Sequence, residues 1–247
     1  MPSVDRLSAL ISRFTLSVTP CAPEAASLLL LAGAGDVEPT CLMLAAEGHA
    51  TWHPPFETVI FSAGVAWGGA DNPLLAALPP EIRHDLRADP EMRGLAGLLQ
   101  AETAAQRCGS ASVLDRLGEV LMVRLLRRQM EEGAVQPGLL GGLADQRLSR
   151  AIVAMHEEPG KPWRNDMLAD LAGLSISRFA ELFRAAVGET PSAYLRKWRL
   201  TLAKQDVVRG DRIQSVARRY GYASPEALTR AFHQAYGKSP TGLRKAS

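Results

Sequence analysis

The C-terminal part of the chain contains an internal repeat. Residues 168–175 match residues 216–224 in residue type, with one extra residue in the second copy. Beyond these stretches the register is constant at an offset of 49 residues, and the coinciding pairs are Ser175 and Ser224, Phe179 and Leu228, Phe183 and Phe232, Gly188 and Gly237, and Pro191 and Pro240. Chance rarely produces so many coincidences, so the sequence predicts two copies of one supersecondary unit.

Each copy has the pattern of a helix-turn-helix. An apolar-faced helix stops at a glycine, which tolerates the left-handed conformation, and a serine a few residues later caps a second helix. In the second helix the apolar residues fall three or four positions apart and are expected to face a core: Phe179, Leu182, Phe183 and Ala186 in one copy, and Leu228, Ala231, Phe232 and Ala235 in the other.

The opposite face of each second helix is polar. It carries Ser177, Arg178, Glu181 and Arg184 in the first unit, and Glu226, Thr229, Arg230 and His233 in the second. An α-helix fits the major groove of B-DNA, where Arg binds guanine, Glu accepts from cytosine and Thr reaches a phosphate or a base edge. These residues are therefore the candidate DNA contacts.

A long helix is predicted between the two units. Residues 192–209 follow Pro191, contain neither Gly nor Pro and end at Gly210. With Pro191 included, such a helix is about 28 Å long, close to the ~34 Å between successive major grooves on one face of DNA. Two recognition helices on one polypeptide can therefore read adjacent grooves. The basic residues of this helix, with a solvated surface as the alternative to phosphate contact, are Arg196, Lys197, Arg199 and Lys204.

The distribution of charge also differs between the two parts of the chain, on either side of residue 142. Residues 1–142 contain ten basic and 16 acidic side chains, whereas residues 143–247 contain 18 basic and ten acidic ones, so the overall charge of +2 hides net charges of −6 and +8. A basic half is expected of a module that binds nucleic acid or another polyanion. Residues 132–142, rich in Gly and Pro, are predicted to be a linker.

The N-terminal half is predicted to begin with strands and to end in helices. Short apolar runs at 27–31, 41–45 and 58–61, broken by Gly and Pro, indicate buried strands. Residues 91–106 and 112–131 indicate a helical hairpin. The predicted fold class is α+β, with a β-rich domain at 1–131 that includes the hairpin 91–131, and an all-α domain at 143–247.

Residues 145–245 closely resemble the DNA-binding domain of the AraC/XylS family of bacterial transcription regulators. The resemblance rests on Leu168-Ala169 through Phe183, on Ala217, Gly221-Tyr222, Ser224 and Arg230-Ala231-Phe232, and on Tyr236 to Pro240. It implies seven helices with two helix-turn-helix units, and base contacts by Ser177, Ala180, Glu181, Glu226, Thr229 and Arg230. Many members carry Gln, Arg or Trp where this first recognition helix has small or acidic residues, so we expect the second unit and phosphate contacts to contribute more of the affinity.

The N-terminal half is similar, more loosely, to the cupin-type sensing domain of one AraC subgroup. The similarity rests on residues 5–8, 72–79 and 114–121, and the cupin part is abbreviated because only about 70 residues precede Asn72. It implies control by a small-molecule ligand or an oxidant. We expect the hairpin 91–131 to mediate homodimerisation, with a purely internal core role as the alternative.

Two side-chain groups bear on what this half senses. Cys21 in a predicted loop and Cys108 beside Arg107 are candidate redox residues, although all three cysteines, Cys41 included, also fit incidental roles. His49 and His53, near Glu47 and Glu57, form the one candidate cluster for metal ligation. Their spacing does not match a cupin metal site, so surface histidines are favoured. We expect no metal and no cofactor.

The sequence thus predicts a sequence-specific DNA-binding transcription regulator with two reading helices, controlled by its N-terminal domain. The alternative is a metal-dependent cupin enzyme fused to a DNA-binding domain. Catalysis is not expected. The expected partners are double-stranded DNA, an effector, RNA polymerase and a second copy of the chain. The longest apolar run, 25–34, is too short to span a bilayer and no secretory signal is recognised, so a cytoplasmic location is expected.

Overall fold

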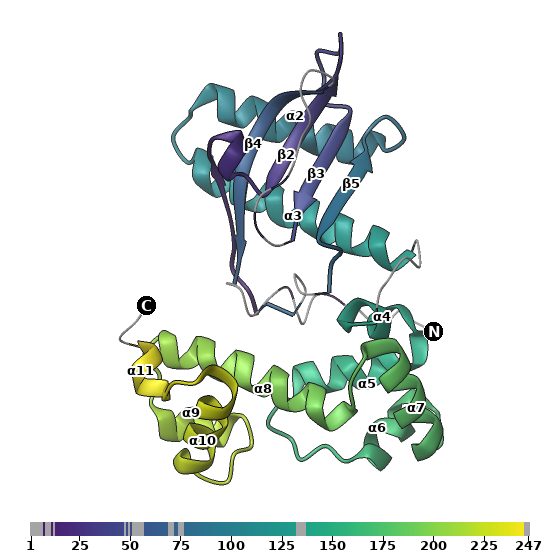
Figure 1. The fold of residues 1–247 in the computed structure, drawn as a ribbon, viewed down its shortest axis with the longest axis vertical. Helices are drawn as coiled ribbons and strands as arrows, with labels where there is room; N and C mark the ends of the chain where they lie inside the picture. Colours follow the sequence, from purple (N-terminus) through teal and green to yellow (C-terminus); the bar gives the residue numbers. More distant parts are fainter. Residues whose placement is uncertain are drawn as a thin grey trace. The chain divides into compact units, whose positions relative to one another are not determined.

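The computed structural model describes residues 7, 11, 13–46, 48, 50, 57–68, 72–73, 77–131 and 137–244. The chain divides into two compact units, one formed by Phe14–Gln136 and the other by Pro137–Ser247 with Met1–Arg13. The N-terminal unit, Phe14–Gln136, combines an antiparallel sheet with helices, and the C-terminal unit is helical (Figure 1). This confirms the α+β class.

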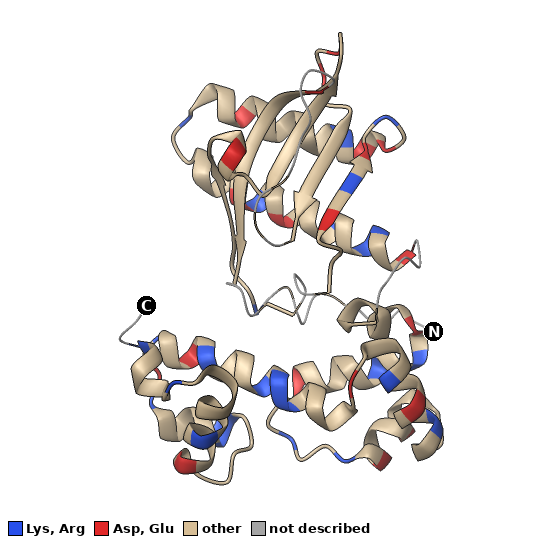
Figure 2. Ribbon diagram, in the orientation of Figure 1, with Lys and Arg blue, Asp and Glu red and all other residues tan. Residues whose placement is uncertain are grey.

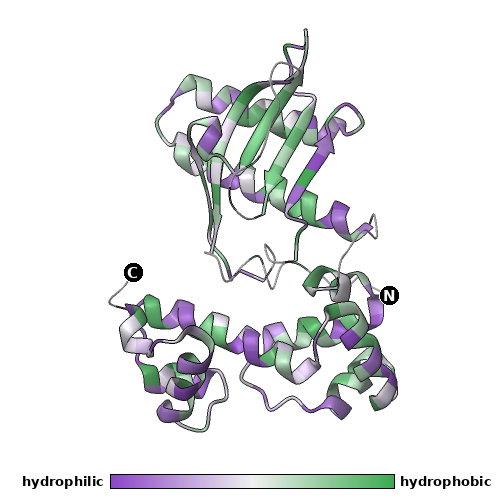
Figure 3. Cartoon of the chain, viewed as in Figure 1, coloured by the Kyte–Doolittle hydropathy of each residue, from purple (hydrophilic) through white to green (hydrophobic). Residues whose placement is uncertain are grey.

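The N-terminal unit contains a five-stranded sheet with the order β1-β4-β2-β3-β5, in which each neighbouring pair is antiparallel. A short 3-10 helix, η1 (Pro23–Ala25), follows the first strand. The strands are β1 (Leu16–Pro20), β2 (Leu28–Gly33), β3 (Cys41–Ala45), β4 (Glu57–Trp67) and β5 (Glu81–Asp85). The sequences of β2 and β3, LLLLAG and CLMLA, are uncharged (Figure 2) and apolar (Figure 3), because both faces of these strands are buried.

Three of the strands were predicted. The apolar runs 27–31, 41–45 and 58–61 correspond to β2, β3 and the first half of β4. Apolar runs did not reveal β1 and β5, which are the outermost strands of the sheet. An edge strand is less enclosed than a central one, and β5 accordingly alternates exposed charged residues with buried ones.

Two helices cover one face of the sheet: α2 (Pro90–Ala105) and α3 (Ser110–Glu131), which confirm the predicted hairpin. In α3, Asp115 Oδ1 accepts a hydrogen bond from the Val18 amide at 2.7 Å. One turn later, a Cβ on Gly118 would lie closer than 3.0 Å to Val18 Cγ2 and 3.2 Å from Leu16 Cδ2. Glycine therefore lets α3 approach β1 closely.

On the other face of the sheet lies a buried apolar cluster. Its members are Ala26, Leu29, Leu31, Met43, Ala45 and Ala50, against which Cys21, Cys41 and Val59 pack. Since side chains alternate along a strand, Leu29 and Leu31 point away from the helices while Leu28 and Leu30 point toward them. All four leucines are fully buried, which explains the uninterrupted apolar sequence of β2.

The C-terminal unit is a bundle of short helices around the longer α8. The helices are α4 (Leu139–Ala144), α5 (Gln146–Glu157), α6 (Asn165–Ala172), α7 (Ile176–Val187), α8 (Pro191–Val208), α9 (Ile213–Arg219), α10 (Pro225–Tyr236) and α11 (Pro240–Arg244). Within the described residues 137–244, α5 to α11 are the seven helices that the resemblance implied. No helix in the described part of the chain is long and apolar enough to span a membrane.

The prediction of a linker at 132–142 was wrong for its last part. Residues 132–136 lie outside the described residues, but α4 begins at Leu139, and the side chains of Leu139, Leu140 and Leu143 are buried. A Cβ on Gly142 would lie 2.5 Å from Ile152 Cδ1 and 2.7 Å from Val187 Cγ2. This glycine serves close packing of α4 against α5 and α7, although in the sequence alone it indicated an irregular segment.

Candidate nucleic-acid interface

The first helix-turn-helix unit consists of α6 and α7. Gly173 ends α6 in the left-handed conformation at φ 67°. Ser175 then caps α7, where its side chain accepts a hydrogen bond from the Arg178 amide. Phe179 and Phe183 on α7 are fully buried, and their rings lie 5.6 Å apart. Cap, turn and core are therefore those that the sequence predicted.

The second unit consists of α9 and α10 and repeats this construction. Gly221 in the turn is left-handed at φ 72°, and Ser224 Oγ accepts a hydrogen bond from the Ala227 amide at 3.2 Å. Leu228 and Phe232 on α10 are fully buried. The longer turn accommodates the one extra residue of the second copy.

The repeat continues past the recognition helices. Gly188 and Gly237 end α7 and α10 in the left-handed conformation, at φ 85° and 66°. Pro191 and Pro240 each occupy the first position of the next helix, α8 and α11. The offset of 49 residues therefore preserves helix ends as well as residue types.

The predicted contacts of the first unit share one exposed surface of α7. Ser177, Arg178, Glu181 and Arg184 are all exposed, whereas Ala180 is half-buried. Arg178 Nη1 and Glu181 Oε2 form an ion pair at 2.8 Å. Their charges largely offset one another, which leaves Arg184 as the unmatched cation among these four residues.

In the second unit, Glu226 and Arg230 are exposed on α10 and Thr229 is half-buried. The Thr229 hydroxyl donates to the Pro225 carbonyl at 2.9 Å, within the helix itself. A hydrogen bond from Ser224 lowers the pKa of the Glu226 carboxyl, so Glu226 is an acceptor at neutral pH. Arg230 and Glu226 thus present a donor and an acceptor one turn apart.

The basic residues of α8 have different surroundings. Arg196 and Lys197 are exposed, and Lys197 Nζ pairs with Glu189 Oε2 at 3.0 Å. Lys204 Nζ lies over the Tyr236 ring, 4.8 Å from its centroid.

Arg199, a predicted phosphate contact, forms hydrogen bonds inside the domain. Its guanidinium is half-buried, and Nε and Nη2 donate to the carbonyl oxygens of Pro159 and Lys161 at 2.5 and 2.7 Å. Burial lowers its pKa. Two of its donors are therefore used within the domain, and the phosphate contact of Arg199 stays a prediction.

Sequence reasoning missed Asp206, which is only 2% exposed. Tyr220 Oη donates to its Oδ2 at 2.7 Å, and its carboxylate also pairs with Arg209 and Arg219. Arg219 reaches Asp211 as well, at 2.7 Å. The signal was available, because Asp206 falls at helical spacing after Leu195 and Leu202, and an acidic residue on an apolar face needs buried partners.

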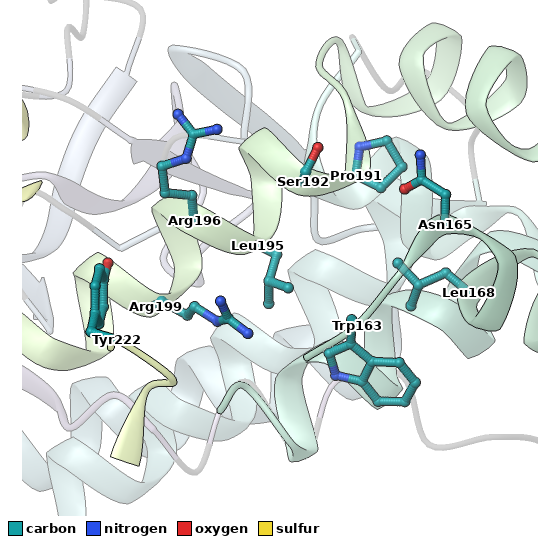
Figure 4. A pocket seen from close by; sticks show the side chains of 9 residues that line it. All are labelled: Trp163, Asn165, Leu168, Pro191, Ser192, Leu195, Arg196, Arg199 and Tyr222. Carbon is teal, nitrogen blue, oxygen red and sulfur yellow. The ribbon is translucent and has the colours of Figure 1, made fainter. Parts of the chain in front are cut away.

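A cavity of about 340 Å³ lies where the two helix-turn-helix units approach one another (Figure 4). Five of its side chains come from α8, and the others come from the loop before α6, from α6 itself and from the turn of the second unit. The lining residues are Trp163, Asn165, Leu168, Pro191, Ser192, Leu195, Arg196, Arg199 and Tyr222.

Two known families match parts of the chain. Residues 168–246 match a family described as a helix-turn-helix domain, and residues 13–131 match a family described as a cupin. The first match begins within α6 and covers the rest of both helix-turn-helix units, and the second covers the sheet and its helical hairpin.

Named relatives are transcription regulators. An HTH-type transcriptional regulator of Haemophilus influenzae is 30% identical over 70% of this chain and 58% of its own length. An AraC-like transcription regulator of Streptomyces lividans is 30% identical over 76% of this chain and 64% of its own. The regulator AlkR of Acinetobacter baylyi is 35% identical over 71% and 59%, respectively. The matched segments thus span about three fifths of each relative's length.

The chain therefore combines a helix-turn-helix domain with an N-terminal cupin domain, and it is similar to AraC-like transcription regulators.

In the cupin domain, the predicted redox residues Cys21 and Cys108 belong to different elements. Cys21 follows β1, is half-buried and packs against the cluster on the sheet face that points away from the helices. Cys108 is exposed in the turn between α2 and α3. Both thiols are free, and their redox role stays a prediction. Cys41 at the start of β3 is half-buried, and burial raises the pKa of its thiol.

The candidate metal cluster lies mostly outside the described residues of the cupin domain. Glu47, His49 and His53 are among the residues that are not described, and Glu57 forms an ion pair with Arg83 at 3.0 Å. Within the described ranges, no group of three or more His, Cys, Asp or Glu side chains is arranged to hold a metal ion.

Proposed function

We propose that this AraC-type protein is a transcription regulator that binds specific double-stranded DNA and inserts α7 and α10 into two adjacent major grooves. The observation that carries the proposal is the presence on one polypeptide of two helix-turn-helix units whose second helices both begin at a capping serine and end at a left-handed glycine. They are joined by α8, an 18-residue helix that is about 27 Å long. Adjacent major grooves on one face of DNA are ~34 Å apart, a distance that two units at the ends of such a helix can match.

In this proposal the two recognition helices have unequal roles. Arg230 donates to a guanine and Glu226 accepts from a cytosine, because both are exposed on α10 and lie one turn apart. Thr229 offers its methyl group, since its hydroxyl is bonded within the helix. On α7, Ser177, Arg178 and Glu181 read bases more weakly because Arg178 and Glu181 pair with each other. Arg184 and Arg196 contact phosphates.

The cupin domain is proposed to control DNA binding in response to a small molecule or an oxidant, and to form the homodimer. Exposed apolar side chains on the helical hairpin support dimerisation: Leu98 is 55% exposed, Val113 41% and Val120 46%. Val113 and Val120 are seven residues apart and therefore share one side of α3. The exposed thiol of Cys108 supports an oxidant as the signal.

Such a regulator acts on chromosomal DNA in the cytoplasm and meets RNA polymerase at the promoter. No catalytic step belongs to the proposal, and the regulator names of the relatives support this.

The test is capture of fragmented genomic DNA by the purified, reduced, full-length protein at near-physiological salt, followed by sequencing of the retained fragments. The proposal predicts a shared motif with two short blocks whose centres lie about one helical turn, or 10–10.5 base pairs, apart. Competition with an excess of random duplex tests specificity, and the same fragments should then still be retained. Retention that random duplex abolishes, with no enriched motif, contradicts sequence-specific regulation.

A further inference from the structure

The second helix-turn-helix unit touches the loop that leads into the first unit, at a pair of glycines. Gly160 lies in that loop, between α5 and α6, and Gly221 lies in the turn between α9 and α10 of the second unit. A Cβ on Gly160 would lie closer than 3.0 Å to the carbonyl oxygen of Arg219, and a Cβ on Gly221 would lie 2.6 Å from the carbonyl oxygen of Gly160. The two backbones are therefore in direct contact.

Arg199 of α8 holds the loop side of this contact. Its two hydrogen bonds end on Pro159 and Lys161, the residues on either side of Gly160. A Cβ on Gly221 would also lie 3.5 Å from Arg199 Nη2. One guanidinium thus fixes the loop that leads into the first unit while packing against the turn of the second.

Asp206 of α8 holds the turn side. It accepts from Tyr220 and pairs with Arg219, the two residues that precede Gly221. Seven residues separate Arg199 from Asp206, which is close to two helical turns, so both side chains leave the same side of α8. Two points on one helix face therefore hold the two segments that touch.

We infer that this junction, formed by Gly160, Gly221, Arg199 and Asp206, fixes the separation and orientation of the two recognition helices, and so determines the spacing of the two DNA blocks that the protein accepts. The inference rests on the proposed DNA binding. It makes Arg199 and Gly160 positioning residues, which act on specificity without contacting DNA.

Spacing is a sensitive readout because each inserted base pair moves one block by about 3.4 Å and rotates it by roughly a tenth of a turn. Units connected by one helix and held at a second point cannot follow this displacement. Units connected by α8 alone adjust more freely, because the turn of the second unit is then released from the first. Loss of the junction should therefore relax the spacing requirement.

The experiment measures the affinity of the full-length protein for duplexes that carry both captured blocks, with the native spacer or with one base pair added or removed. For the wild type we expect a loss of roughly tenfold or more for either change, comparable to one mismatched base pair. Gly160→Ala and Arg199→Ala should bind the three duplexes within about threefold of one another, less than the cost of one mismatch. Gly160 is suited to this test because its own backbone does not require a positive φ.

Arg164→Ala is the matched control, because Arg164 ends the same loop, is exposed and pairs with Asp166 at 2.6 Å. It removes the same charge and should keep the wild-type spacing ratio. Circular dichroism checks folding, and Arg199→Lys, which keeps the charge but loses the paired donors, replaces any variant that does not fold.

The possible results separate the two claims. Equal wild-type binding to all three spacers overturns the junction inference but leaves DNA binding in place, and so does an unchanged ratio in folded Gly160→Ala and Arg199 variants. Absence of sequence-specific binding by the wild type contradicts the proposed function itself.

Discussion

At the scale of single residues, His156 shows how burial determines the protonation state of a side chain. The sequence offers only an isolated histidine, but the structure buries it among aromatic rings, with its centroid 4.4 Å from that of Trp198. Its Nε2 lies 2.5 Å from Tyr194 Oη. Burial, with a smaller contribution from the charge of Arg13, lowers the pKa of His156 to about 3. The folded C-terminal unit therefore holds this imidazole in its neutral form.

This burial predicts an acid-sensitive stability. The folded pKa lies below the unfolded value of about 6.5, so between these values the unfolded chain binds more protons and stability falls as the pH falls. One such group contributes up to about 1.4 kcal/mol per pH unit. Urea unfolding of the C-terminal unit, followed by tryptophan fluorescence at pH 7 and pH 5.5, should show this slope in the wild type and a smaller one in His156→Gln. His233→Gln, at an exposed histidine, should retain the wild-type slope; equal slopes in all three proteins argue against the burial effect.

At the scale of elements, whether a glycine inside a helix stabilises the protein depends on how closely a neighbouring element packs against it. Gly118 in α3 touches β1, whereas a Cβ added to Gly97 in α2 would meet no atom of another element within 4 Å. Both lie inside helices of the same domain. Helix propensity alone favours alanine at each site by about 1 kcal/mol, so any difference between them measures packing.

We therefore expect Gly118→Ala to destabilise the N-terminal unit by about 1–3 kcal/mol, because the added methyl group forces α3 away from Val18. Gly97→Ala should instead stabilise it by up to about 1 kcal/mol. Thermal and urea unfolding of the two variants check both signs. A stabilising effect of Gly118→Ala would contradict the close contact between α3 and β1.

Elements were predictable where their signals are local. Ser175 and Ser224 predict where α7 and α10 begin, because a capping hydrogen bond joins residues three positions apart. The linker assignment failed at Gly142, because a glycine in contact with Ile152 has the same sequence signature as a flexible one. The internal hydrogen bonds of Arg199 were missed for a related reason. Helical spacing places it on the polar surface of α8 but does not reveal the loop carbonyls that the fold brings to it.

At the scale of the whole molecule, the helical hairpin is proposed to join two copies of the chain. Val120→Glu places a charge on the apolar stripe of α3 and should shift the protein from dimer to monomer in sedimentation equilibrium at micromolar concentration. Val37→Glu is the matched control, since Val37 is 88% exposed in the turn between β2 and β3. It should leave the dimer intact. A wild-type monomer, or a dimer that persists in Val120→Glu, contradicts this interface.

The central claim is that α7 and α10 read separate blocks of one DNA site. It is tested most directly by selecting bound sequences from a random duplex library in parallel with the wild type and with Arg230→Ala, whose side chain is exposed on α10. We predict that Arg230→Ala loses about 1–3 kcal/mol of preference at one position of one block, while the other block is unchanged. Equal loss of preference in both blocks, or an unchanged motif with uniformly weaker binding, would contradict the assignment of α10 to its own block.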